Sequence, residues 1–347
     1  MFTKDTLTIK KYIENNFKTS KYGFNELKSL YNYLNGIQNH YEIIKTNQND
    51  NNNHLHFNNP YISDEINEDI KLLNNNYNVI LKKNNNIVTI NIYHNEKSIQ
   101  LFIQNIILVI SYIIHLFNKQ IGDININYYL TDLKKIINDN IDHGLNYEHV
   151  NNGCCSPLTN TIDIWRKEEV MKVTIHELMH LFHCDKSMND NSFIIDLYHK
   201  RYNINSIRVN TFEAYTEIWA NILNCYFLSR NKYNNFVHYL SIEKEWCKFQ
   251  ANKIFSITNL DKKDTVDINK YTNVLAYFII RCEIFNRIKD FIKIFGKNIC
   301  CNSPNYFIFL KNLDKCVKNG GLIKKIKKNK SYVDKTLRMT AMELKLF

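Results

Sequence analysis

Two histidines and a glutamate fall within five residues near the centre of this 347-residue chain. His176, Glu177 and His180 form the pattern H-E-x-x-H. On an α-helix, residues four apart lie on the same face, so the two imidazoles can bind one metal ion. Glu177 lies about 100° further round the helix and can reach a water molecule on that metal. The pattern therefore indicates hydrolysis assisted by one Zn²⁺ ion, with Glu177 as the general base.

A hydrolytic zinc site usually has three protein ligands and a water molecule, so a third ligand is required. His183 lies seven residues after His176, which on a helix is about 10.5 Å of rise and too far for one ion to bridge. Lys186 occupies the position at which a metzincin would have its third histidine. His199 is available if residues 185–198 fold back as a loop.

A second predicted helix, beginning near Asn210, is the strongest source of the third ligand. Glu213 and Glu217 are four residues apart and share one face of this helix. One carboxylate can bind zinc while the other accepts the N–H of a ligand histidine and fixes its tautomer. Asn210 and Glu213 also fit a helix capping box, which is the competing interpretation. The apolar residues around Trp219 indicate a packed helix and favour the metal site.

Hydrolysis of this kind also needs a hydrogen-bond donor for the developing oxyanion. His199, Tyr215 and His238 carry ring N–H or hydroxyl groups that could serve as this donor or as a proton donor. The sequence does not rank the three.

The elements that position these residues follow from the spacing of apolar side chains. Residues 77–82 and 87–93 predict a β-hairpin, because the asparagines between them tolerate the positive φ of a tight turn. An apolar helix follows over 97–117, and residues 123–130 alternate like a further strand. The order strand, helix, strand predicts a parallel pair with a right-handed crossover.

Residues 161–166 predict a strand immediately before the motif helix, which we expect over 167–184. Glu168 and Glu169 would then lie in its first turn, where the helix dipole favours anions. A strand at the sheet edge beside this helix could hold an extended peptide by main-chain hydrogen bonds. The alternative is an ordinary sheet strand with no part in binding.

The remaining sequence is mostly helical by pattern. We expect an N-terminal helical pair over 5–46, a polar loop over 47–60, and later helices over 235–255, 271–295 and 306–317. The predicted class is α+β, with a small mixed β-sheet, the H-E-x-x-H helix and a largely helical C-terminal subdomain. The predicted parts are a helical appendage with an Asn-rich loop (1–60), a sheet-containing subdomain with the motif helix (61–185), and a helical subdomain with the third ligand and a basic C-terminal segment (186–347).

Composition limits the partners and the compartment. The net charge is +11, but it is concentrated only at 324–330, where no aromatic residues are interleaved, so a nucleic-acid partner is not favoured.

Nine cysteines form no C-x-x-C pair, and their odd number argues against a complete disulfide framework. The N-terminus lacks the apolar core of a signal peptide, which indicates the cytoplasm and not secretion. Polar residues interrupt the apolar run 101–117, which favours a buried helix over a membrane span.

The two motif helices together resemble the gluzincin metallopeptidases, in which H-E-x-x-H is followed some tens of residues later by a helix bearing E-x-x-x-D or E-x-x-x-E. The resemblance covers residues 149–228, and the stretch 162–169 with the motif helix is also similar to zinc peptidases encoded by large DNA viruses. It implies zinc ligands His176, His180 and Glu213.

The resemblance also implies catalytic Glu177 and a supporting role for Glu217. The implied fold is a zincin with its active site between a mixed sheet and C-terminal helices, and the implied location is the host cytoplasm or the virion. Ala214 replaces the glycine common after the ligand glutamate in aminopeptidase-like members, and no G-A-M-E-N-like motif is present. Exopeptidase and endopeptidase action therefore both stay open.

The function that these observations predict is a zinc metallopeptidase that acts on a peptide or protein substrate. Two alternatives belong to other classes. The first is a catalytically inactive zincin-like structural or virion protein. The second is a basic nucleic-acid-binding protein that uses residues 322–330.

Overall fold

The computed structural model is built on one open mixed sheet of six strands. The strands are β1 (Glu42–Asn49), β2 (Asn75–Lys83), β3 (Asn86–His94), β4 (Ile124–Tyr129), β5 (Gly153–Ser156) and β6 (Thr161–Ile164). Their order is β1-β2-β3-β4-β6-β5, in which β4 pairs in parallel with both β3 and β6 and the other pairs are antiparallel. The hairpin of β2 and β3 and the parallel pairing of β3 with β4 confirm those predictions. With the helices that follow, the α+β class is also confirmed.

The structure describes most of the chain. The described residues are 1–18, 24–37, 41–49, 59, 62–83, 86–119, 121–137, 145–185, 190–258, 268–296, 298–300, 303–316 and 331–347. The predicted basic segment at 324–330, most of the Asn-rich loop at 47–60 and the hairpin turn at 84–85 lie outside them.

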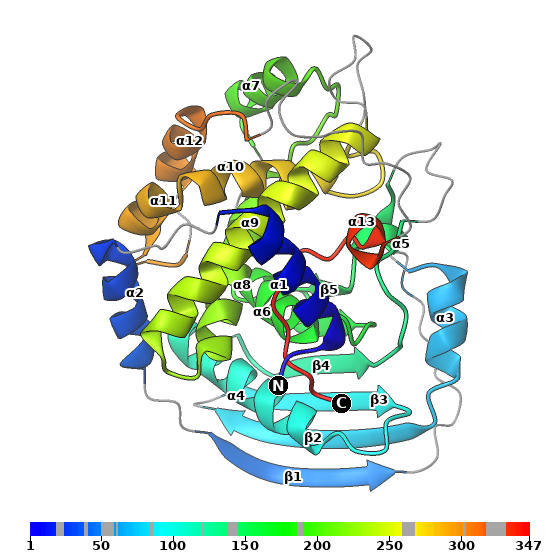
Figure 1. The fold of residues 1–347 in the computed structure, drawn as a ribbon. Coiled ribbons are helices and arrows are strands. Elements are labelled where there is room, and N and C mark those ends of the chain that lie inside the picture. Colours follow the sequence, from blue (N-terminus) through cyan, green and yellow to red (C-terminus); the bar gives the residue numbers. More distant parts are fainter. Residues whose placement is uncertain are drawn as a thin grey trace.

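Helices make up most of the remaining described structure, and Figure 1 shows α8 and α9 lying above the sheet. The helices are α1 (Lys4–Asn16), α2 (Asn25–Asn35), α3 (Asp64–Lys71), α4 (Gln100–Phe117), α5 (Tyr147–Val150), α6 (Val170–Leu181), α7 (Ser192–Tyr202), α8 (Thr211–Ser229), α9 (Tyr233–Ile257), the π-helix η1 (Leu275–Ile280), α10 (Arg281–Asn286), α11 (Ile288–Phe295), α12 (Ser303–Lys311) and α13 (Tyr332–Lys335).

The N-terminal region departs from its prediction. Helices α1 and α2 form, but residues 42–49 are strand β1 instead of helix and polar loop, because they pair with β2 along its open edge. Residues 1–60 thus contribute to the same sheet as the residues that follow. The subdivision of the chain at residues 60 and 185 stays a prediction.

Helix α4 connects β3 to β4 and is largely buried. Phe102, Ile106 and Ile110 are fully buried in the same core as Leu178 of the motif helix. Among the described residues, α4 is the helix whose length and hydropathy would suffice to cross a membrane, and 56% of it is buried within the protein. Its apolar surface therefore contributes to the core that supports α6.

Two predictions about the motif helix and its strand are wrong. Strand β6 is not an edge strand, because it pairs with β4 on one side and with the short strand β5 on the other. The sheet edge beside α6 is therefore β5. Helix α6 begins at Val170, so Glu168 and Glu169 precede its first turn. Both are buried, because Glu168 accepts a hydrogen bond from the Lys135 N–H and Glu169 forms an ion pair with the Lys135 side chain.

The predicted helix over 271–295 is divided in the structure. Its residues form η1, α10 and α11 in succession, and the backbone changes from π to α geometry at Arg281. A π-helix turn is rare and is frequently found at functional sites. The predicted helix over 235–255 corresponds to α9, whereas the one predicted over 306–317 is formed only as far as Lys311, where α12 ends.

A buried irregular segment follows α13. Residues 336–343, here named the strap, run from α13 toward the C-terminus, and Figure 1 shows this part of the chain in red beside α1. Gln250 of α9 donates to the carbonyl oxygens of Thr336 and Arg338 at 3.0 and 2.8 Å. The backbone N–H of Thr340 donates to the carboxylate of Glu169. The strap thus lies between α9 and the beginning of the motif helix.

Candidate metal centre

Helix α6 packs against several other elements, which fixes the positions of the two histidines that it carries. Ile175, Leu178 and Met179 are fully buried, and the helix packs against α4, α8 and β5. The side chain of His176 is 7% exposed, and that of His180 is 18% exposed. The second histidine therefore lies nearer to solvent than the first.

Three potential ligand atoms converge between α6 and α8. The Nε2 atoms of His176 and His180 lie 2.9 Å apart, and Oε2 of Glu213 lies 3.4 Å from each. Ligand atoms bound tetrahedrally at about 2.0–2.1 Å lie roughly 3.3 Å apart. Among the described residues, no hydrogen-bond donor satisfies this buried carboxylate oxygen. The three residues therefore fit a single metal ion, because each offers one ligand atom and these atoms all lie within 4.8 Å of one another.

A carboxylate lies beside the outer nitrogen of each histidine. Nδ1 of His176 is 2.9 Å from Oε1 of Glu217, and Nδ1 of His180 is 2.6 Å from Oδ2 of Asp185. A carboxylate in this position fixes the ring tautomer and leaves Nε2 free to bind a metal. Both imidazoles are thus oriented with Nε2 toward the common point.

The electrostatics of the group favour a cation. Burial alone would lower the pKa of His176, but Glu217 and Glu213 raise that pKa above its usual value. Burial would also raise the pKa of Glu213, but His180 and His176 hold it well below its usual value. The group therefore attracts positive charge, which a metal ion could supply in place of protons.

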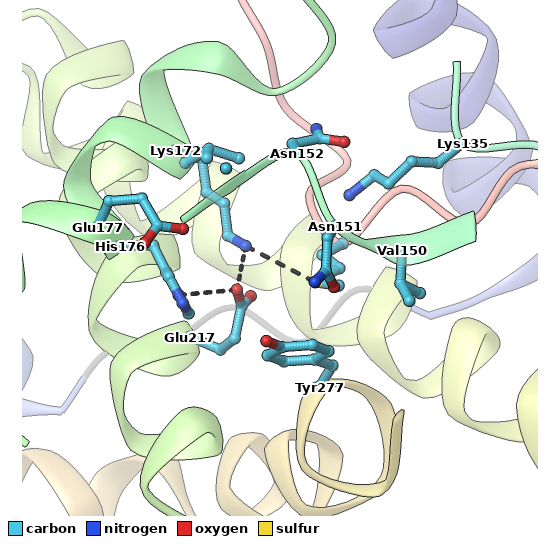
Figure 2. Close-up of a pocket in the computed structure, with 12 residues that line it drawn as sticks. Lys135, Val150, Asn151, Asn152, Lys172, His176, Glu177, Glu217 and Tyr277 are labelled. Atoms are coloured by element: carbon cyan, nitrogen blue, oxygen red, sulfur yellow. Dashed lines mark hydrogen bonds and ion pairs between the residues drawn. The ribbon is translucent and has the colours of Figure 1, made fainter. Parts of the chain in front are cut away.

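Glu217 is part of a buried charge network. Lys172 donates to its Oε1, and Nη1 of Arg281 lies 3.3 Å from its Oε2. Figure 2 shows Lys172, His176 and Glu217 directed toward one another from α6 and α8. Burial opposes ionisation, but Lys172 and His176 hold the pKa of Glu217 well below its usual value. Its carboxylate is therefore ionised and held in place beside His176.

Glu177 and Tyr277 face a small cavity next to this group. The cavity has a volume of about 30 Å³ and is also lined by His176, Lys172 and Glu217, which is room for a water molecule. Burial raises the pKa of Glu177 above its usual value. The ring centroid of Tyr277, from η1, lies 6.3 Å from that of His176. Figure 2 shows both side chains at the cavity.

Other residues predicted for the site have different partners. His183 is exposed with a positive φ of 51° just beyond α6, outside the ligand group. Nε2 of His199 lies 2.6 Å from the carbonyl oxygen of Ser206, and the Tyr215 hydroxyl donates to that of Ile299 at 2.9 Å. His238 is on α9 beside Glu14 of α1. None of the three predicted donors lines the cavity.

Sequence patterns did not single out Asp185, Lys172 or Tyr277. Asp185 follows the motif helix with no recognisable spacing. Lys172 precedes His176 by four residues in an otherwise apolar helix, and this buried charge is a signal that could have indicated a partner carboxylate. Tyr277 has the spacing of an ordinary core aromatic residue within the predicted helix 271–295.

Comparison with known proteins adds no relative. No protein-family model, no curated protein and no solved structure matches the chain. A function for the site is therefore inferred from the chemistry of its side chains.

Proposed function

We propose that this chain is a zinc-dependent metallopeptidase of zincin-like architecture, with one zinc ion held by His176, His180 and Glu213. The convergence of two Nε2 atoms and one carboxylate oxygen in a triangle with sides of 2.9, 3.4 and 3.4 Å carries the proposal. Two histidines and one glutamate are a donor set of hydrolytic zinc sites, which keep a further position for water. Zinc bound there would lower the pKa of water toward about 7 and polarise a substrate carbonyl group.

Glu177 would move the proton. Its carboxylate faces the cavity beside His176, where it can accept a proton from water and then deliver it to the amine nitrogen of the departing peptide. Burial raises the pKa of Glu177, which helps it to hold the proton between the two transfers. The hydroxyl of Tyr277 is the candidate donor to the carbonyl oxygen, because Tyr277 lines the same cavity.

The sheet edge supports a peptide as the substrate. Strand β5 ends the sheet and pairs only with β6 among the described strands, so its outer edge has no strand partner. A Cβ on Gly153 would lie 2.9 Å from Cγ1 of Val173, so β5 packs closely against α6. An extended peptide could add to this edge by main-chain hydrogen bonds and pass the cavity.

Zinc content tests the ligand set. We expect the purified chain, dialysed against zinc and then against buffer, to retain one zinc ion by mass spectrometry, and Glu213→Ala to lose most of it. Glu68→Ala removes an exposed carboxylate on α3 and should retain the metal. A wild-type chain without zinc after this treatment would contradict the proposal.

Cleavage of a fluorogenic peptide library tests the reaction. Glu177→Gln should lower the cleavage rate by at least about 100-fold, because a general base contributes about 10²–10⁴-fold. It should keep its zinc, because Glu177 is not a ligand. Undiminished cleavage would refute the assignment of Glu177, and zinc binding without cleavage by the wild type would favour the inactive zincin-like alternative.

A further inference from the structure

Two cysteines meet beyond the C-terminal end of α6. Cys184 follows α6 and Cys300 follows α11, and their Sγ atoms lie 3.5 Å apart although 116 residues separate them in the sequence. Both are free thiols in the structure. A disulfide bond is about 2.05 Å long, so the two sulfur atoms must approach by roughly 1.5 Å to form one.

The two thiols differ in exposure and charge. Cys184 is fully buried, whereas Cys300 is partly exposed. The hydrogen bond with Cys184 and the positive charge of Lys119 lower the pKa of Cys300 to about 6, although burial opposes this change. Lys119 is anchored by its own hydrogen bond of 2.6 Å to the carbonyl oxygen of Phe182. An accessible thiolate next to a buried thiol is the arrangement of an attacking and a resolving cysteine.

We propose that Cys300 and Cys184 form a thiol–disulfide exchange site whose co-reactant is a small disulfide such as glutathione disulfide. The Cys300 thiolate attacks one sulfur of glutathione disulfide, the S–S bond breaks, and one glutathione thiolate leaves with the electron pair. Cys184 then attacks the Cys300 sulfur, the bond between Cys300 and glutathione breaks, and the proton of Cys184 passes to the departing thiolate, so that the second glutathione leaves as a thiol. Two protein thiols are oxidised to one disulfide, and one glutathione disulfide is reduced to two glutathione thiols.

The cross-link would join two segments that contact the helices of the metal group. Cys184 is adjacent to Asp185, which contacts His180 on the α6 side. Ile299, adjacent to Cys300, accepts the hydrogen bond from Tyr215 of α8. A bond between the two cysteines therefore ties the turn after α6 to the loop that contacts α8. Closing so long a loop of chain also restricts the unfolded state.

Peptide mapping of the oxidised protein tests this site. The full-length chain is incubated with glutathione disulfide, alkylated, digested without reduction and examined by mass spectrometry. We expect a peptide linking Cys184 to Cys300, together with a higher midpoint of thermal unfolding. Cys184→Ser should instead accumulate glutathione on Cys300, because the resolving thiol is absent, and Cys300→Ser should show neither product.

Cys301→Ser is the matched control, because it removes the neighbouring thiol in the sequence. It should form the Cys184–Cys300 link as the wild type does. A link that involves Cys301, or equal amounts of glutathione on Cys184→Ser and Cys300→Ser, would overturn the assignment. Circular dichroism of each reduced variant confirms its folding, and Cys300→Ser alters only a partly exposed position.

Discussion

The two ends of helix α6 are supported in different ways. Before its first turn, Lys135 and Glu169 form an ion pair whose side chains are 1% and 0% exposed, and the strap covers them. After its last turn, His180 and Asp185 form a pair whose side chains are 18% and 20% exposed. The same helix therefore has a fully buried charge cluster at one end and a partly hydrated pair at the other.

The two ends of α6 therefore have different roles, one in supporting the fold and the other in the chemistry of the site. Charges in the buried cluster have lost their water, so each depends on its partner, and removal of one leaves the other unpaired. At the hydrated end, water can replace a lost partner at small cost. We infer that the first end holds α6 in position, while the second can accept a metal ion, a substrate or a disulfide without loss of the fold.

Loss of a buried partner at the first end should have the largest effect on stability. Lys135→Met leaves the Glu169 carboxylate without its ion-pair partner, and we expect the free energy of unfolding to fall by about 3–5 kcal/mol. Lys134→Met is the matched control, because Lys134 pairs with Asp5 at the surface, and it should cost less than about 1 kcal/mol. Urea denaturation of the zinc-free variants measures both, and equal losses would contradict the comparison.

Part of the pH dependence of stability should come from the first end as well. Glu243 accepts hydrogen bonds from the strap residues Thr340, Ala341 and Met342. Burial raises the pKa of Glu243 from 4.5 to about 7, although these hydrogen bonds oppose the rise. A folded-state pKa above the unfolded value means that the stabilising contribution is complete below pH 4.5 and is lost as the pH rises through 7.

Glu243→Gln should remove this dependence. We expect the wild type to lose on the order of 3 kcal/mol more than the variant between pH 4.5 and 7. The pKa values of Glu283 and Glu343 are raised to about 7 in the same direction, so the difference between the two proteins isolates Glu243. Parallel curves of unfolding free energy against pH would show that Glu243 is not responsible.

Weakening the hydrated end should affect metal binding more than stability. Asp185→Asn removes the charge beside Nδ1 of His180, and we expect zinc affinity to fall by about 10–100-fold. The free energy of unfolding without zinc should change by less than about 1 kcal/mol. Asp196→Asn, at an exposed position on α7, is the control for both measurements. A large loss of stability would show that this end is as tightly coupled as the first.

The part of the site that lies on regular helices could be predicted from the sequence. His176 and His180 share a face because they are four residues apart, and the same spacing places Glu213 and Glu217 together on α8. The helical period therefore determines these pairs once each helix forms. The meeting of α6 with α8 depends on tertiary packing, which the spacing alone does not determine.

The supports that lie off regular helices could not be predicted in this way. Asp185 acts from a turn, and Tyr277 acts from a π-helix, whose period differs from that of an α-helix. Strand β1 depends on pairing with β2 more than on its own pattern, because Ile43 and Ile44 are both about half exposed. Glu169 appeared suited to the helix dipole, but the strap and Lys135 satisfy it.

The strap has a consequence for the order of folding. Glu169 accepts from the Thr340 N–H across 171 residues of chain, and its own N–H donates to Glu343 across 174 residues at 2.5 Å. Contacts between residues so far apart in the sequence form slowly, because the chain must lose the entropy of closing a long loop before the contact can stabilise it. The sheet hairpin and the local helices can form before this closure. We therefore expect α6 to reach its final position late, and a refolding chain to capture a metal ion only after most of its secondary structure is present.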